Sequence, residues 1–115
     1  MSTRRTEDDR IALLQGTLDL LIMRTLLFGT EHGQGIARAI QSMSGDELLV
    51  DHGSLYPALQ RLLLNGYVDA SWGPSENNRR ARFYTLTKAG RKHLADERAE
   101  FTELVAAIQR VLEIA

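Results

Sequence analysis

Basic side chains are concentrated in one part of this sequence. Residues 77–93 hold six basic residues and no acidic one, and Arg79, Arg80 and Arg82 fall within four positions, directly after two asparagines. A guanidinium group binds phosphate through paired hydrogen bonds and also enters narrow minor grooves. Charged hairpin tips can instead serve solubility. The density of arginines favours contact with a nucleic-acid backbone.

A second set of polar side chains lies in the stretch from 51 to 72. Four leucines, Leu55, Leu59, Leu62 and Leu63, follow helical spacing and predict a buried stripe. Tyr56, Gln60 and Arg61 point away from that stripe. Glutamine pairs with adenine and arginine with guanine, although Arg61 lies far along the helix and suits a phosphate better. The predicted DNA-contacting residues are Ser54, Tyr56, Pro57, Gln60, Arg61, Arg79, Arg80 and Arg82.

The helix that carries this face should cover about 53–65. Its N-cap is either Ser54 or Asp51, and the second choice places Pro57 deeper in the helix. Asn65-Gly66 should end it. Alternating residues then predict a strand near 67–72, and a second strand near 82–86 makes a hairpin whose tip carries the arginines.

Two further helices look too apolar to be buried within one chain of 115 residues. Residues 11–28 carry two apolar stripes, and the one with Met23 exceeds what the interior of a monomer can bury. Thr17 is a candidate N-cap for a helix that begins after Gly16. Thr87 should cap a last helix over 88–114. Both helices are predicted to pair with a second copy of the chain. The predicted dimerisation residues are Leu13, Leu20, Leu27, Phe101, Leu104, Val105, Ile108, Val111 and Leu112.

The order of elements predicts a fold. A helix near 33–43 follows a turn at 30–33, and Ser44-Gly45-Asp46 is a turn before the helix of 53–65. Helix, helix, turn, helix and hairpin form a mainly α winged helix-turn-helix with a two-stranded β-wing. We divide the chain into a flexible N-terminus (1–10), a winged-helix domain (11–86) and a C-terminal dimerisation helix (87–115) in one compact unit.

Composition excludes several classes of protein. The chain is 43% hydrophobic and 25% charged and carries a net charge of -1. It has no cysteine, so it can form no disulfide and offers no thiolate ligand. No apolar run approaches the roughly 20 residues of a membrane span. The polar first ten residues lack the apolar segment of a signal peptide, which predicts a cytoplasmic protein.

Neither catalysis nor metal binding is expected. Asp51, His52 and Ser54 lie within one turn of one segment, whereas a catalytic triad converges from separate elements. His32, His52 and His93 fall in different elements without a second ligand nearby, so no zinc site is predicted. A hydrogen-bonded turn or cap role is expected for each histidine. No cofactor is predicted.

The motifs resemble those of the PadR-type transcriptional regulators, and within them a short-tailed branch labelled acidobacterial. The resemblance rests on LLQGTLDLLI, HGQGIARAI, GSLYPALQRL and NNRRARFYTLTKAGRKHL, which with the helical tail cover about nine tenths of the chain. It implies a winged-helix dimer that binds double-stranded DNA and represses transcription.

The sequence departs from the family at one position. The family usually has an aromatic residue after the His-Gly pair, whereas this chain has Gln34. A contact made by that aromatic is therefore not carried over. Some relatives bind flat effectors between aromatics at the dimer centre, but the single tryptophan here, Trp72, falls on the wing, so no small-molecule effector is indicated.

Two functions from different classes fit the pattern. The first is a repressor that binds a pseudo-palindromic operator as a homodimer. The second is a winged-helix protein-interaction module that has lost DNA binding, which would suit the slightly negative net charge. The arginines of the wing favour the first.

Overall fold

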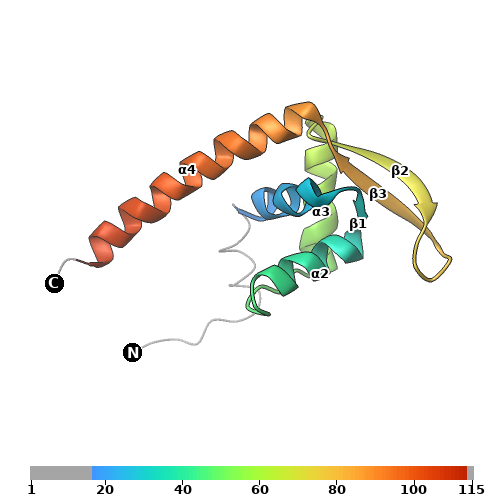
Figure 1. The fold of residues 1–115 in the computed structure, drawn as a ribbon, viewed down its shortest axis with the longest axis horizontal. Coiled ribbons are helices and arrows are strands. Elements are labelled where there is room, and N and C mark those ends of the chain that lie inside the picture. The colour runs from blue at the N-terminus through green and yellow to red at the C-terminus, as the bar shows by residue number, and fades with distance from the viewer. Residues whose placement is uncertain (1–16, 114–115) are drawn as a thin grey trace.

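The computed structural model of the chain describes residues 17–113 (Figure 1). Residues 17–25 are helical and pass into a short 3-10 helix, η1 (Leu26–Phe28). The elements that follow are β1 (Glu31–His32), α2 (Gly33–Met43), α3 (His52–Leu64), β2 (Val68–Pro74), β3 (Arg80–Leu86) and α4 (Lys88–Leu112). The predicted mainly α winged helix-turn-helix is confirmed. The predicted N-terminal segment of 1–10 and the break at Gly16 lie outside the described residues, and Thr17 is itself helical rather than a flanking cap.

One hydrophobic core joins the helices with β2 and β3. The leucine stripe of α3 forms its centre, because Leu55, Leu59 and Leu62 are at most 1% exposed, as its spacing predicted. The remaining core residues are Leu18, Ile22, Met23, Leu26, Ile36, Ile40, Ala58, Val68, Tyr84, Leu86 and Leu94. The spacing of the leucines therefore predicted correctly which face of α3 is buried in the core.

The first helix contributes more to this core than its sequence suggested. Met23 is fully buried within the single chain, so the prediction that its stripe was surplus is wrong for this residue. Leu20 is partly buried and Leu27 is 37% exposed. Ile22 and Met23 are adjacent and both fully buried, so the buried face of this helix is wider than a single stripe.

The sheet has three strands, in the order β1-β3-β2. β1 pairs antiparallel with β3 through Glu31↔Tyr84 and His32↔Phe83, so the predicted turn at 30–33 is instead a short strand. Two residues are too few to show an alternating pattern, and it is pairing with β3 that makes them a strand. The wing hairpin itself is confirmed.

The hairpin strands are longer than predicted. β2 and β3 pair from Val68↔Leu86 outward to Pro74↔Arg80. Proline donates no hydrogen bond to a ladder, but β2 is an edge strand, where this is tolerated. Arg79 thus lies in the loop, whereas Arg80 and Arg82 lie on β3.

The end of α3, the start of β2 and the start of α4 meet at Tyr67. Gly66, with φ 76, ends α3 in the left-handed conformation that its sequence predicted. Thr87 caps α4 by accepting from the Gly90 N–H at 3.0 Å and donates its hydroxyl to the Gly66 carbonyl at 2.7 Å. The Tyr67 carbonyl accepts from the Thr87 N–H at 3.0 Å. We call this arrangement the Tyr67 joint.

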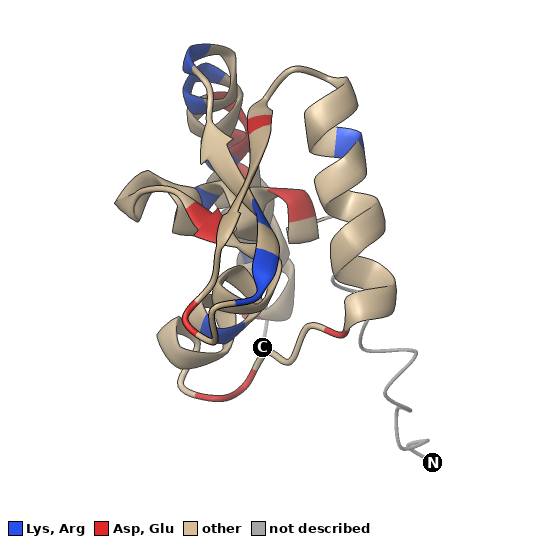
Figure 2. Ribbon diagram, turned by 90° about the vertical axis from the view of Figure 1, so that its right-hand side faces the viewer, with Lys and Arg blue, Asp and Glu red and all other residues tan. Residues whose placement is uncertain are grey.

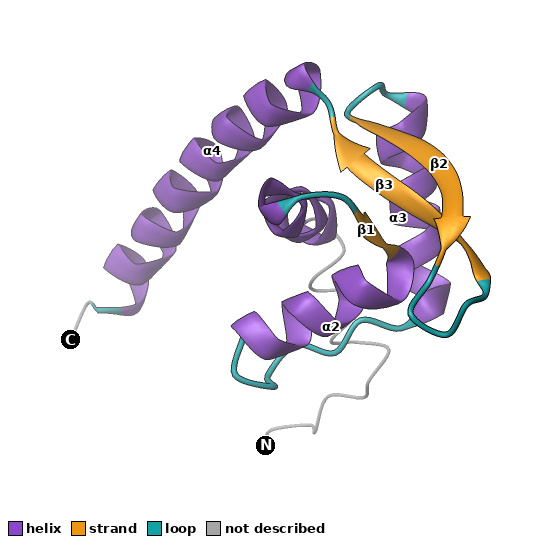
Figure 3. Cartoon of the chain, turned by 45° about the vertical axis from the view of Figure 1, so that its right-hand side comes forward, coloured by secondary structure: helices purple, strands orange, loops and turns teal. Residues whose placement is uncertain are grey.

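Beyond the joint, α4 extends away from the winged-helix core (Figures 1 and 3). Leu94 is its last buried residue, and no residue from 95 to 112 is buried in the single chain. Large apolar side chains are exposed along this part, namely Phe101, Leu104, Ile108, Val111 and Leu112, while Val105 is partly buried.

Replacing Gly90 with alanine should destabilise the fold. A Cβ at this position would lie 2.1 Å from the Tyr67 carbonyl oxygen and 2.7 Å from Leu86 Cδ1, so the backbone of the joint must shift. We expect a loss of about 1–3 kcal/mol in the free energy of unfolding, measured by urea denaturation. Gly53→Ala is the matched control, since its Cβ would meet only Asp51 Oδ1 at 3.4 Å. Equal stability of the two variants would contradict the prediction.

Candidate nucleic-acid interface

Asp51 fixes the start of the exposed helix α3. Its backbone is extended, with φ -82 and ψ 162, and its Oδ1 accepts from the Ser54 N–H at 2.7 Å. Of the two caps left open by the sequence, the structure selects Asp51. Ser54 lies in the first turn and is partly buried, and Pro57 lies inside the helix. Pro57 cannot donate to the Gly53 carbonyl, and both residues are exposed.

Tyr56 lies where α3 meets the beginning of α2. It is 45% exposed, and its ring meets His52 edge to face at a centroid distance of 5.5 Å. A Cβ on Gly33 would lie 2.9 Å from the Tyr56 hydroxyl oxygen, so the absence of a side chain at Gly33 makes room for the ring. His52 thus packs on a tyrosine, and the predicted hydrogen-bonded role is wrong for it.

Gln60 and Arg61 have different surroundings although they are adjacent. Gln60 is exposed, one turn after Tyr56. Arg61 donates through Nη2 to Asp19 Oδ1 of the first helix at 2.9 Å, and both side chains are partly exposed. Among the described residues, Tyr56, Pro57 and Gln60 are thus exposed on α3 without an ion pair, whereas contact between Arg61 and DNA would compete with Asp19.

The wing presents its arginines on and beside a tight turn. The Ser75 N–H donates to the Arg79 carbonyl at 2.7 Å, and Asn78 takes up the left-handed conformation with φ 57. Arg79 and Arg80 are exposed, and Arg82 is partly buried. Figure 2 shows basic and acidic segments on the hairpin, the acidic residues there being Asp69 and Glu76, whereas α3 carries no acidic residue.

The two arginines of β3 each make a cation–π contact with an aromatic side chain. The Arg80 Cζ lies 5.1 Å from the centre of the Trp72 ring, and the Arg82 Cζ lies 5.9 Å from that of Tyr84. Burial raises the pKa of the Tyr84 hydroxyl, and the Arg82 guanidinium beside it opposes part of that rise. Residue type and spacing did not indicate Trp72 as part of the site, although its alternation with Val68 and Ala70 predicted that it shares their face of the strand.

An acidic residue accompanies the basic turn. Glu76 lies within the hairpin loop and its Oε1 is 3.8 Å from Arg38 Nη2 of α2. The expectation of an acid-free tip holds from residue 77 onward but overlooks this neighbour. Both side chains are well exposed, so the pair contributes little to stability. The ion pair nevertheless brings a charged residue of α2 next to one of the hairpin loop.

The two other histidines, His32 and His93, make contacts within the fold. His32 is the N-cap of α2, because its Nδ1 accepts from the Gly35 N–H at 3.1 Å, as expected of a capping residue. His93 lies inside α4, where its ring stacks on Tyr67 with centres 4.0 Å apart and its Nε2 lies 3.8 Å from Glu97 Oε1, so the predicted turn or cap role is wrong for it. Gln34, at the position where the family usually has an aromatic, is exposed and lines a hollow of about 240 Å³ with Arg38, Gln41 and His52.

Within residues 17–113, no group of three or more metal-binding side chains occurs. No helix in the same part of the chain is both long enough and apolar enough to cross a bilayer.

The α3 face beside a basic hairpin defines the class of protein as a winged-helix transcriptional regulator. The PadR-like family of transcriptional regulators matches residues 22–96, and the chain belongs to this family. A transcriptional regulator from Clostridium thermocellum superposes with a TM-score of 0.78 at 25% identity, over 86% of this chain and 96% of the other. A PadR family regulator from Eggerthella lenta shares the fold, with a TM-score of 0.76 at 21% identity, over 94% and 92% of the two chains.

A relative known from sequence covers nearly the whole chain as well. An uncharacterized protein from Lysinibacillus sphaericus is 24% identical over 104 residues, which are 90% of this chain and 95% of that protein. The match therefore includes α4 as well as the winged-helix core.

Replacing Asp51 with alanine should destabilise α3 by about 1 kcal/mol, because the Ser54 N–H loses its side-chain acceptor. Thermal unfolding measures the change. Ser54→Ala is the matched control, since Asp51 binds the backbone of Ser54 and not its hydroxyl. A larger loss for Ser54→Ala than for Asp51→Ala would show that the cap is assigned to the wrong residue.

Proposed function

We propose that this PadR-family protein binds double-stranded DNA as a homodimer and represses transcription by occupying a pseudo-palindromic operator. The observation that carries the proposal is the position of Tyr56 and Gln60 on α3 beside a hairpin that bears Arg79, Arg80 and Arg82. A helix of this kind enters the major groove while the wing meets the backbone or minor groove. The protein acts in the cytoplasm and has no catalytic step.

The proposed dimer is supported by the apolar surface of α4. In the single chain Phe101 is 38% exposed, Leu104 56% and Ile108 48%, at helical spacing on one face. Two grooves flank the junction of α4 with the first helix. One, of about 460 Å³, is lined by Leu20, Phe101 and Leu104 among others.

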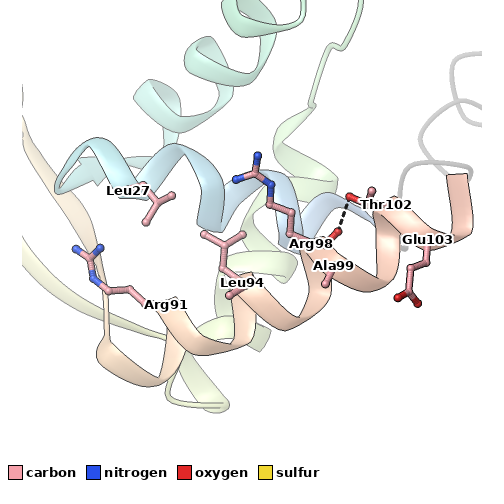
Figure 4. A pocket seen from close by; sticks show the side chains of 8 residues that line it. Leu27, Arg91, Leu94, Arg98, Ala99, Thr102 and Glu103 are labelled. Carbon is pink, nitrogen blue, oxygen red and sulfur yellow. Dashed lines mark hydrogen bonds between the residues drawn. The ribbon is translucent and has the colours of Figure 1, made fainter. Parts of the chain in front are cut away.

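The other groove measures about 590 Å³ and lies between Leu27 and the α4 residues Arg91, Leu94 and Arg98 (Figure 4). A second copy that packs along α4 would cover apolar surface in both grooves. Of the dimerisation residues proposed from the sequence, Leu20, Phe101 and Leu104 line the first groove and Leu27 lines the second, while Leu13 lies outside the described residues.

The second candidate function is a protein-interaction module. The net charge of -1 and the presence of Glu76 at the tip of the wing favour it. Against it, an interaction module has no use for three arginines beside a polar helix face. Selection of bound fragments from random DNA distinguishes the two, because a module of this kind enriches no sequence.

A dimeric repressor should enrich an inverted repeat with half-sites about one helical turn, ~10 bp, apart. Footprinting on that operator should protect both half-sites, and expression of the protein should lower transcription of a reporter placed behind it. Protection of a single half-site, or a rise in reporter expression, would contradict the proposal.

Replacing Ile108 with glutamate should dissociate the dimer. Two-fold symmetry would bury unpaired carboxylates in the seam, at a cost of roughly 3–5 kcal/mol. Sedimentation velocity at micromolar concentration should show a dimer for the unmodified chain and a monomer for the variant. Arg110→Gln, which changes the net charge equally on the opposite side of α4, is the control and should leave the dimer intact. An unmodified chain that sediments as a monomer refutes the prediction.

Replacing Gln60 with alanine should reduce specificity. If the amide reads a base edge, its loss costs roughly 1–3 kcal/mol on the selected operator and little on random DNA. The dependence of affinity on salt should hardly change. Fluorescence anisotropy on the two DNAs measures both quantities, and an equal loss on both DNAs would remove Gln60 from base recognition.

Replacing Arg79 or Arg82 with alanine should weaken binding to every sequence. Each lost phosphate contact should reduce the slope of log K against log salt by about one unit. Arg110→Ala, at the far end of α4, supplies a control for the change of charge. Lost specificity at an unchanged salt slope would show that these arginines read bases.

A further inference from the structure

The face of the wing hairpin that adjoins α3 carries a continuous row of aromatic and basic side chains. Strand pairing places Trp72 opposite Arg82, and Ala70 opposite Tyr84. Because side chains alternate along a strand, Trp72 shares the face of buried Val68 and half-buried Ala70, which is turned toward the core. Nearer the tip the same face leaves the core, and Trp72 is 59% exposed.

This row begins beside α3, against which β2 packs, and ends at the turn. The Arg82 Cζ lies 5.9 Å from the centre of the Tyr84 ring. Arg80 then lies against the Trp72 ring at 5.1 Å. The described part of the chain thus provides a surface that leads from the exposed face of α3 to the tip of the hairpin.

We propose that Trp72 and Arg80 form one DNA-contacting unit, in which the exposed indole packs on the sugar-phosphate backbone and holds the Arg80 guanidinium toward a phosphate. This inference rests on the proposed DNA-binding function. Charge complementarity selects the occupant, because Arg80 lies against the indole and Arg82 is the cross-strand partner of Trp72. The indole is planar and rigid, so it restricts the guanidinium and lowers the entropy lost when Arg80 binds.

The unmodified protein provides a direct test, because Trp72 is its single tryptophan. A duplex selected from random DNA, labelled at one end, is titrated while label anisotropy and tryptophan emission are followed together. We expect both signals to change over the same range of concentration, and the duplex should reduce quenching of the emission by acrylamide.

Three results of this titration have different meanings. If anisotropy reports binding while the emission and its quenching stay constant, the indole is away from DNA and the inference fails. If no duplex binds, the proposed function itself fails. If the emission instead depends on protein concentration without DNA, Trp72 lies between copies of the chain, and the inference fails as well.

A double-mutant cycle tests whether the two residues act as a unit. Trp72→Leu should weaken binding about two- to fivefold, as expected for loss of an exposed cation–π contact. The same change in an Arg80→Ala background should weaken binding much less, since no guanidinium remains to be held. Trp72→Phe should recover part of the loss, and Ser71→Ala, on the opposite face of β2, should have no effect. Additive losses from Trp72→Leu and Arg80→Ala would overturn the proposed unit.

Discussion

The constraint on which the remaining structure depends is the close approach of α4 to the Tyr67 carbonyl. That oxygen accepts from Thr87 and leaves no space for a Cβ at Gly90. The Tyr67 ring stacks on His93 one turn further along α4. The end of α3, the root of the wing and the root of α4 are therefore held at a single point. The proposed reading surface and the proposed dimer surface are joined at that point, and Leu94 of α4 adds a contact with the shared core.

Local patterns in the sequence located most of the fold. The leucines of α3, the glycine after Asn65 and the cap at Thr87 each act within one turn of the backbone, so their effects can be read without knowing the rest of the chain. β1 could not be found in this way, because Glu31 and His32 become a strand only through pairing with β3. The burial of Met23 likewise depends on how helices converge. Both features belong to the tertiary structure.

In the candidate interface, too, the sequence predicted the locally determined features and missed the contacts that depend on tertiary structure. Residue type and spacing indicated Gln60 and the wing arginines. Gln60 is exposed because it lies off the apolar stripe of α3, and the arginines lie on or beside the hairpin turn. Partners distant in sequence escaped that reasoning. Arg61 is paired with Asp19, 42 positions earlier, and Glu76 with Arg38 of another helix. Trp72 was placed on the correct strand, but its contact with Arg80 depends on the register of the hairpin.

The last buried side chain of α4, Leu94, lies well before its end at Leu112. The remaining turns receive little support from the core, and in proteins most of the stability of a helix comes from tertiary packing rather than from intrinsic propensity. Conformational entropy therefore opposes this tail in a separate chain, at roughly 1–2 kcal/mol of backbone ordering per residue. In the proposed homodimer, pairing and helix formation would be one coupled equilibrium. Subunit affinity would then respond to changes in helix propensity at exposed positions that touch no partner.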